Sequence, residues 1–191
     1  MLYILSMEYT SIGKNDLKIS KFALGTWPFA GGELWGDQDD NDSIEAVMEC
    51  YENGINFFDT APGYGDGRSE EVLGKAVKNI RNSVIIGTKI PPADLGKRNL
   101  SISVEKSLKR LGTDYIDLMQ IHWPNHDIPI DETTNELENL IKSGKVTEIG
   151  VSNFGLKDMT EILDELDIVT NQLPYNAFWR AIEHDIKPFC I

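Results

Sequence analysis

The sequence predicts one α/β domain of the (β/α)8 type, the TIM-barrel fold. Short runs rich in Val, Ile and Phe alternate six times with longer amphipathic runs, as in parallel strands buried under helices. Polar residues cluster just after the short runs, where such a barrel collects its functional side chains. A doubly wound dinucleotide-binding sheet is less well supported, because GYGDG at 63–67 lacks the G-x-G-x-x-G spacing.

Six strands are predicted, because each short run is apolar without strict polar alternation. In chain order these strands cover residues 21–27, 55–60, 84–90, 116–123, 146–151 and 168–173. The second of them, INFFDT, drives an apolar run into the interior and ends on the carboxylate of Asp59. A hairpin-like segment, EYTSIGKNDLKIS, precedes the first strand.

Five helices are predicted from apolar residues spaced three and four positions apart. They cover residues 42–51, 69–80, 100–111, 131–142 and 156–166. The first carries Asp42 and Glu45 as a pair that resembles a capping box, and Gly54 follows as its stop signal. Gly112 and Gly144 close two of the others.

Length limits the number of strand-and-helix units. A complete barrel has about 250 residues, so each of its eight units takes about 31. The 191 residues therefore hold about six units, and the chain stops within a helical pattern, AIEHDIKPFCI. We expect a single domain over residues 1–191 that is incomplete at its C-terminus. Its first and sixth strands would then have open edges, through which copies can associate.

Charge and composition disfavour several classes of partner. The chain has 18 Lys and Arg against 31 Asp and Glu, and this net charge of −13 repels nucleic acid and anionic lipid. No apolar run reaches the about 20 residues that span a bilayer, and MLYILSM lacks the features of a signal peptide. The two cysteines, Cys50 and Cys190, are too few for a disulfide framework, which favours the cytoplasm.

Four residues at the ends of successive predicted strands form a candidate catalytic group: Asp59, Tyr64, Lys89 and His122. Each alone has an ordinary structural interpretation, such as a turn cap or a buried histidine. Together they form a pattern that suits acid catalysis. An ammonium beside a phenol lowers the pKa of the phenol, and a carboxylate keeps that ammonium charged. A tyrosine tuned in this way donates a proton near neutral pH.

These residues lie within motifs that resemble the aldo-keto reductase family, over essentially all of residues 7–191. The motifs are GTW, FDTAPGYGDGRSEEVLG, GTK, SLKRLGTDYIDLMQIHWP, SGKVTEIGVSNF and NQLPYN, in the order that the family has them. The resemblance implies an NADPH-dependent barrel that reduces aldehydes and ketones. It also makes Tyr64 the general acid, Lys89 and Asp59 its tuning pair, and His122 the residue that orients the substrate carbonyl.

The resemblance also implies binding residues for the cofactor and the substrate. Gly25, Thr26 and Trp27 would lie near the nicotinamide ribose, and Asp59 beside them. Ser152, Asn153 and Gln172 would hold the nicotinamide carboxamide. Trp27 and Trp123 are expected as walls of the substrate pocket, and Trp35 is as compatible with simple packing. No metal is expected.

The same resemblance suggests how the chain starts and what it lacks. The opening register of the family begins at Met7, which makes residues 1–6 an apolar stub. The expected seventh and eighth units would carry the aromatic residue that stacks on the nicotinamide and the loop that holds the 2′-phosphate. Without them, this piece could be inactive even though its proton-transfer residues are present.

Two other functions compete with a reductase. A non-catalytic regulatory or binding member of the same family would keep the fold without turnover. A metal-dependent barrel hydrolase or isomerase needs several converging ligands, and only Asp59 and His122 qualify. Lys89 between them would repel a cation, so we rank the metal enzyme last.

Overall fold

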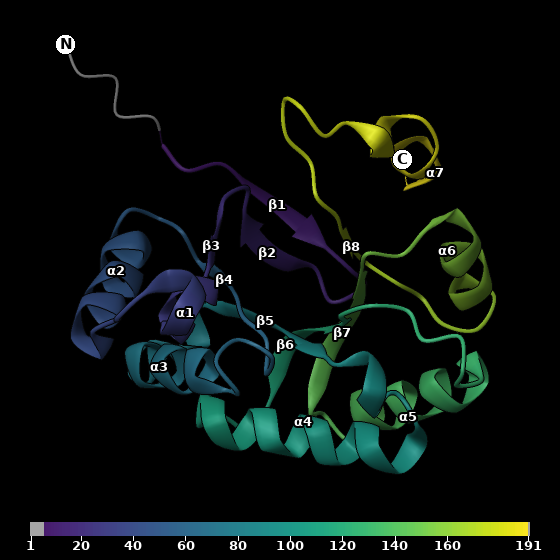
Figure 1. Ribbon diagram of the computed structural model, residues 1–191, viewed down its shortest axis with the longest axis horizontal. Coiled ribbons are helices and arrows are strands. Elements are labelled where there is room, and N and C mark those ends of the chain that lie inside the picture. The colour runs from purple at the N-terminus through teal and green to yellow at the C-terminus, as the bar shows by residue number, and fades with distance from the viewer. Residues whose placement is uncertain (1–5, 191) are drawn as a thin grey trace.

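The computed structural model describes residues 6–190 and contains a curled sheet with helices along its outer side (Figure 1). Residues 1–5 of the expected N-terminal stub lie outside the described residues, so the expectation that the natural start is Met7 stays a prediction.

Six parallel strands form the sheet in chain order, each paired with the next one along the chain. They are β3 (Ala23–Gly25), β4 (Phe57–Asp59), β5 (Ile85–Ile90), β6 (Ile116–Ile121), β7 (Val146–Ser152) and β8 (Asn171–Gln172). The sheet curls as part of a barrel does, which confirms the predicted fold class with six strand-and-helix units (Figure 1).

The two outermost strands are much shorter than predicted. The prediction of a strand over 21–27 is wrong at both ends, because only 23–25 pair with β4 and a 3₁₀ helix, η1 (Trp27–Ala30), begins at Trp27. Pro28 within η1 has no backbone N–H to donate to a ladder. Of the strand predicted over 168–173, only 171–172 form β8, which has a single neighbour.

Seven α-helices are present in residues 6–190, and the five predicted ones are among them. They are α1 (Gly32–Trp35), α2 (Asp40–Glu52), α3 (Arg68–Val77), α4 (Lys97–Leu111), α5 (Ile130–Lys142), α6 (Leu156–Leu163) and α7 (Ile186–Cys190). Three further 3₁₀ turns are η2 (Arg81–Ser83), η3 (Pro92–Asp94) and η4 (Ala181–Glu183). None of the described helices is long and apolar enough to cross a membrane.

The start of α2 differs from its prediction. The helix begins at Asp40, and the side chain of Asp39 accepts a hydrogen bond from the backbone N–H of Asn41. Asp39 is therefore the capping residue, and the proposed pair of Asp42 and Glu45 is not the cap. Several acidic residues lie in a row here, and sequence spacing alone did not identify which one precedes the first turn.

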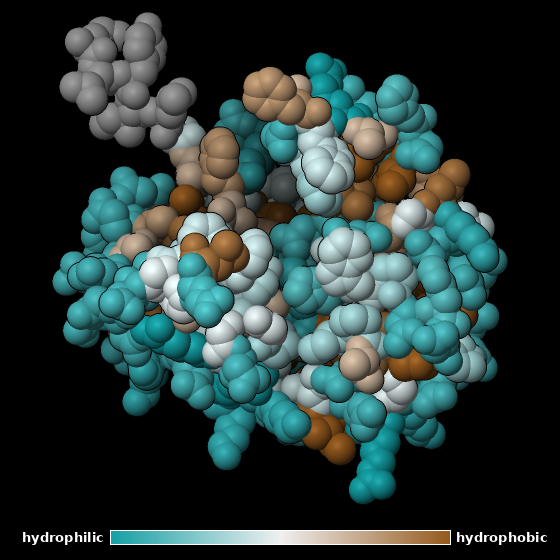
Figure 2. Space-filling model, viewed as in Figure 1, coloured by the Kyte–Doolittle hydropathy of each residue, from teal (hydrophilic) through white to brown (hydrophobic). Residues whose placement is uncertain are grey.

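The core lies between the sheet and the helices. Side chains alternate along each strand, so Ile86, Thr88 and Ile90 of β5 face the helices while Gly87 and Lys89 face the inside of the curl. Each fully buried aliphatic side chain contributes about 1.5–3 kcal/mol to folding. The outer surface of the helices is mostly hydrophilic in the view of Figure 2.

A hairpin of β1 (Tyr9–Ile12) and β2 (Leu17–Ser20) closes the end of the curl where the strands begin (Figure 1). Asn15, in its turn, donates from its backbone N–H and from its side chain to Oε1 of Glu148, near the start of β7. Gly13 has a φ of 71°, and a β-carbon there would lie 2.3 Å from the Glu148 carboxylate. Glycine is therefore required at this close approach.

Candidate active site

The centre of the site is a buried ion pair between Asp59 and Lys89. Asp59 ends β4, and Lys89 lies on β5 with its side chain 1% exposed. The Lys89 ammonium donates to Oδ1 and Oδ2 of Asp59 at 2.8 and 2.7 Å, and to the carbonyl of Thr60 at 2.9 Å. These acceptors fix the ammonium in place and balance its charge in a site with little water.

The strand register explains how Asp59 and Lys89 reach one another. Asp59 lies opposite Gly87 of β5, and a β-carbon at Gly87 would approach the Phe57 ring to 3.0 Å. The missing side chain at Gly87 leaves space inside the curl for the Asp59 carboxylate. In the segment IGTK of β5, Gly87 therefore leaves the space for the Asp59 carboxylate, and Lys89, two positions later, pairs with that carboxylate.

Gln120 is a site residue that the sequence reasoning missed. It lies on β6 opposite Lys89, is 2% exposed, and donates from Nε2 to Oδ1 of Asp59 at 3.3 Å. On its other side, Gly150 of β7 leaves room, because a β-carbon there would come within 3.2 Å of Gln120. The available signal was a polar residue within the mostly apolar run IDLMQIHW, two positions before His122 and so on the same face.

Tyr64 lies in the loop after β4, with its hydroxyl 3.3 Å from the Lys89 ammonium, which donates to it. Its ring stacks on Trp27 at 5.7 Å between centroids, and this contact positions the phenol from the opposite side. The predicted lowering of the phenol pKa is wrong for this structure. Burial, followed by the negative charge of Asp59, raises the pKa of Tyr64 to about 12. Asp59 neutralises the ammonium that was expected to stabilise phenolate.

His122 follows β6, and its backbone N–H donates to the carbonyl of Ile90 at 3.0 Å. Its ring meets the ring of Tyr64 edge-on, with 6.1 Å between centroids. Burial lowers the pKa of His122, and the positive charge of Lys89 lowers it further. The imidazole is therefore neutral at neutral pH and retains one N–H donor.

A second group of buried polar residues supports the site from behind. Thr26 is fully buried; its hydroxyl donates to the carbonyl of Asp59 and shares a hydrogen bond with Ser69. The Thr26 side chain is thus turned toward Asp59 and Ser69, and the expectation that Thr26 lies near the nicotinamide ribose stays a prediction. On the helix side of β5, Glu70 accepts hydrogen bonds from Thr88 and from Arg110, so the strand that carries Lys89 is tied to α3 and α4.

The residues expected at the nicotinamide carboxamide lie together at the ends of β7 and β8. The Ser152 hydroxyl donates to the backbone carbonyl of Gln172, and Nδ2 of Asn153 donates to the carbonyl of His122 and to Oγ of Ser152. Among the described residues, Oδ1 of Asn153 and the exposed carboxamide of Gln172 make no hydrogen bond. One free acceptor and one free amide complement the donor and acceptor of a carboxamide.

The other predicted binding residues lie around the open side of the site. Gly25 ends β3 opposite Asp59, and a β-carbon there would meet no atom within 4 Å. Trp27 and Trp123 are 47% and 53% exposed, and Trp35 of α1 meets Trp27 edge-on at 5.5 Å. The site thus has a polar, buried floor and an aromatic, accessible rim. Within residues 6–190, no three His, Cys, Asp or Glu side chains gather as metal ligands do.

Known proteins resemble this chain in sequence and in fold. The model of the Aldo/keto reductase family matches residues 21–191. "Aldo-keto reductase YhdN" of Bacillus subtilis is 42% identical over 96% of this chain and 58% of its own length, and "NADH-specific methylglyoxal reductase" of Escherichia coli is 35% identical over 96% and 64%. A crystal structure of an aldo/keto reductase from Klebsiella pneumoniae with NADP and acetate superimposes with a TM-score of 0.88 at 33% identity, over 96% of this chain and 64% of that one. The chain thus spans about three fifths of the length of these proteins.

Proposed function

Because the chain belongs to the aldo/keto reductase family, we propose that it provides the proton-transfer side of an enzyme that reduces aldehydes and ketones to alcohols. One observation carries this proposal: the hydroxyl of Tyr64 lies 3.3 Å from an ammonium that Asp59 holds with two hydrogen bonds. A positioned phenol of this kind is a general acid.

Tyr64 would donate its proton to the oxygen of the substrate as negative charge develops there. With a pKa of about 12, the phenol is protonated throughout the physiological range. An alcohol is a weaker acid than this phenol, so proton transfer from Tyr64 to an alkoxide is favourable. The raised pKa therefore keeps Tyr64 protonated, and the phenol can still donate its proton to an alkoxide.

The remaining buried groups would orient this acid and the substrate. Lys89 fixes the Tyr64 hydroxyl by donating to it, and Asp59 with Gln120 fixes Lys89. The neutral imidazole of His122 can donate to the substrate carbonyl, which polarises it and orients its carbon. A small aldehyde or ketone would lie against the accessible rings of Trp27 and Trp123.

A nicotinamide dinucleotide, NADPH in our proposal, supplies the hydride in this chemistry. Ser152, Asn153 and Gln172 are the residues that would hold its carboxamide, with Gly25 and Trp27 near the ribose. The relatives differ in their cofactor: one is an NADH-specific methylglyoxal reductase, and one structure contains NADP. Measured affinities of this chain for NADPH and NADH decide between them.

The test is Tyr64→Phe, with Tyr115→Phe as a matched control away from the site. In a chain extended to the length of its relatives, we expect Tyr64→Phe to lower carbonyl reduction by about 10²–10⁴-fold while NADPH affinity stays within about twofold. Tyr115→Phe should leave both unchanged. Full turnover by Tyr64→Phe would remove Tyr64 from its role. NADPH binding by that extended chain without reduction of any aldehyde or ketone would favour a non-catalytic member of the family.

A further inference from the structure

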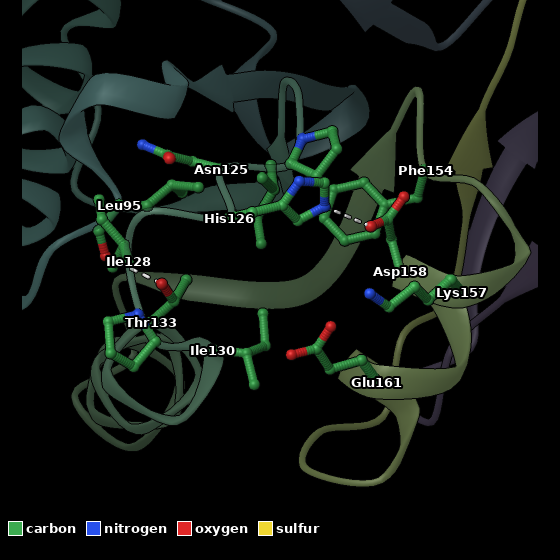
Figure 3. Close-up of a pocket in the computed structure, with 13 residues that line it drawn as sticks. Leu95, Asn125, His126, Ile128, Ile130, Thr133, Phe154, Lys157, Asp158 and Glu161 are labelled. Carbon is green, nitrogen blue, oxygen red and sulfur yellow. Dashed lines mark hydrogen bonds and ion pairs between the residues drawn. The ribbon is translucent and has the colours of Figure 1, made fainter.

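A cavity of about 250 Å³ lies outside the curled sheet, between the loop that follows β6 and helix α6 (Figure 3). Its floor is apolar, because Leu95, Ile121 and Phe154 are at most 3% exposed and line it. Ile128 and Ile130 complete this apolar side. The cavity is separate from the site around Tyr64, which contributes no residue to its lining.

Two oppositely charged side chains of α6 extend into the cavity. Lys157 and Glu161 lie one helical turn apart, and both point toward the apolar side in Figure 3. In the described part of the chain, neither makes an ion pair with the other or with a third residue. Glu138 and Lys142 of α5 have the same spacing in the opposite order and do pair, at 2.7 Å. The Lys-before-Glu order is the weaker one on a helix, so the charges at 157 and 161 remain available.

The other polar groups of the lining already have partners. Asp158 accepts from the backbone N–H of Gly155 with Oδ2, and its Oδ1 is 2.7 Å from Nε2 of His126. Thr133 donates to the carbonyl of Leu95. A ligand in the cavity would therefore find one ammonium and one carboxylate on α6, opposite an apolar surface.

We propose that this cavity binds a free α-amino acid with a branched aliphatic side chain, such as L-leucine. Its carboxylate would face Lys157, its ammonium would face Glu161, and its side chain would lie against Leu95, Ile121 and Phe154. A simple anion would leave Glu161 unpaired, and a simple cation would leave Lys157 unpaired, so a zwitterion fits best. An engineered cavity of about 150 Å³ holds benzene, so a cavity of about 250 Å³ suits a larger molecule of about nine non-hydrogen atoms.

The position of the cavity gives such a ligand a route to the candidate active site. Ile121 immediately precedes His122, and Phe154 immediately follows Asn153. An amino acid packed on these two side chains would restrict the segments that carry the imidazole and part of the carboxamide site. Binding itself, however, requires neither the proposed reductase activity nor its cofactor.

The test is a titration of the methyl-labelled chain with L-leucine, followed by NMR. We expect shifts at the methyl groups of Leu95, Ile121, Ile128 and Ile130, with a Kd on the order of 1 mM for so small a ligand. Two analogues isolate the charges: 3-methylbutylamine lacks the carboxylate, and 4-methylpentanoate lacks the ammonium. Each should bind about three- to tenfold more weakly than leucine.

Substitutions at the exposed positions 157 and 161 test the proposal without disturbing the fold. Lys157→Met and Glu161→Gln should each weaken leucine binding about three- to tenfold, whereas Lys142→Met and Glu138→Gln on α5 should not change it. The proposal is overturned if leucine shifts none of these methyl groups at about twenty times the expected Kd. It is also overturned if either analogue binds as tightly as leucine, or if both α6 variants bind leucine as the unmodified chain does.

Discussion

The middle of the sheet and its edges differ in the length of their strands and in how deeply those strands are buried. Strands β5, β6 and β7 have six, six and seven residues, and every residue of β6 is buried. Strands β3 and β8 have three and two residues, most of them exposed or half-buried. Lys89 lies in the middle, with Asp59 beside it on β4, and His122 directly follows β6. Gln172 lies on the edge, and Ser152 and Asn153 adjoin it.

This difference separates the two halves of the proposed site. The proton-transfer half rests on buried ion pairs and long strand pairings, so its geometry is set by the fold. The carboxamide half depends on a two-residue strand and an exposed glutamine, so it has fewer contacts to hold it. We therefore expect substitutions in the middle to be costly and those at the edges to be mild.

The largest effect on stability should come from Lys89→Met. Removing the ammonium leaves the carboxylate of Asp59 buried and unpaired, which costs about 3–5 kcal/mol of unfolding free energy. Lys145→Met is the control, because its pair with Glu105 is half exposed and should contribute less than about 1 kcal/mol. Urea denaturation of both variants measures the difference. Equal losses would mean that the middle of the sheet is no more firmly built than the surface.

A pair of glycine substitutions compares a close approach to backbone atoms with a close approach to a side chain. A β-carbon at Gly74 on α3 would lie 2.5 Å from the backbone carbonyl oxygen of Leu111, which cannot move without shifting α4. A β-carbon at Gly150 would meet the Thr170 hydroxyl at 2.1 Å, on the segment that leads into the edge strand. We expect Gly74→Ala to destabilise by about 1–3 kcal/mol and Gly150→Ala by about 1 kcal/mol or less. The reverse order in urea denaturation would show that the Thr170 side chain gives way less easily than the Leu111 backbone.

A smaller effect should appear at alkaline pH. The folded-state pKa of Tyr64 is about 12, above its ordinary value of 10.0, so the folded protein keeps a proton that the unfolded chain releases. The stability that this retained proton contributes is fully present below pH 10 and is lost as the pH rises toward about 12. Burial lowers the pKa of Lys89 from its ordinary value of 10.5, so the folded protein releases this proton at a lower pH than the unfolded chain does. Below pH 10.5 the contribution of Lys89 to stability therefore rises with pH, opposite to that of Tyr64. Tyr64→Phe should therefore lose less stability than the unmodified chain across this window. Parallel losses would mean that Tyr64 does not titrate there.

The smallest effect on stability should come from the segment after β8. Phe178 is fully exposed and Trp179 is 59% exposed, so they extend the apolar surface beside the open edge. Phe178→Lys should change the free energy of unfolding by less than about 0.5 kcal/mol. It should nevertheless weaken self-association in sedimentation experiments. Ile102→Lys on α4, a helix that packs on β5 in the middle of the sheet, should not weaken it, and identical association of both variants would argue against contact through the edge.

The sequence predicted the middle of the fold better than its edges. The strands at 84–90 and 116–123 and the helix at 131–142 are close to the observed elements, because long apolar periodicities identify buried elements well. The lengths of the strands predicted at 21–27 and 168–173 were overestimated. Their residues have similar propensities, but pairing at an edge depends on which neighbour is present, and a sequence does not show that.

The candidate site divides in a similar way. Asp59, Lys89 and His122 were identifiable as polar residues at the ends of apolar runs, Tyr64 follows Asp59 in the next loop, and the structure brings the four together. Gln120 escaped notice because it lies within a strand rather than after it. The direction of the Tyr64 pKa shift was also missed. It depends on the balance between burial, Asp59 and Lys89, which requires distances and not only residue types.

The hairpin at the start of the chain has a consequence for how the protein folds. Asn15 bonds Glu148 across 133 residues of sequence, so this contact can form only after β7 has been made. At about 5–20 residues per second on a ribosome, synthesis from Asn15 to Glu148 takes about 7–27 s, and the hairpin cannot make this contact before then. Its docking should therefore be a late step, and contacts of such long separation slow folding. Refolding of Glu148→Gln should thus keep its early phase while its last phase changes.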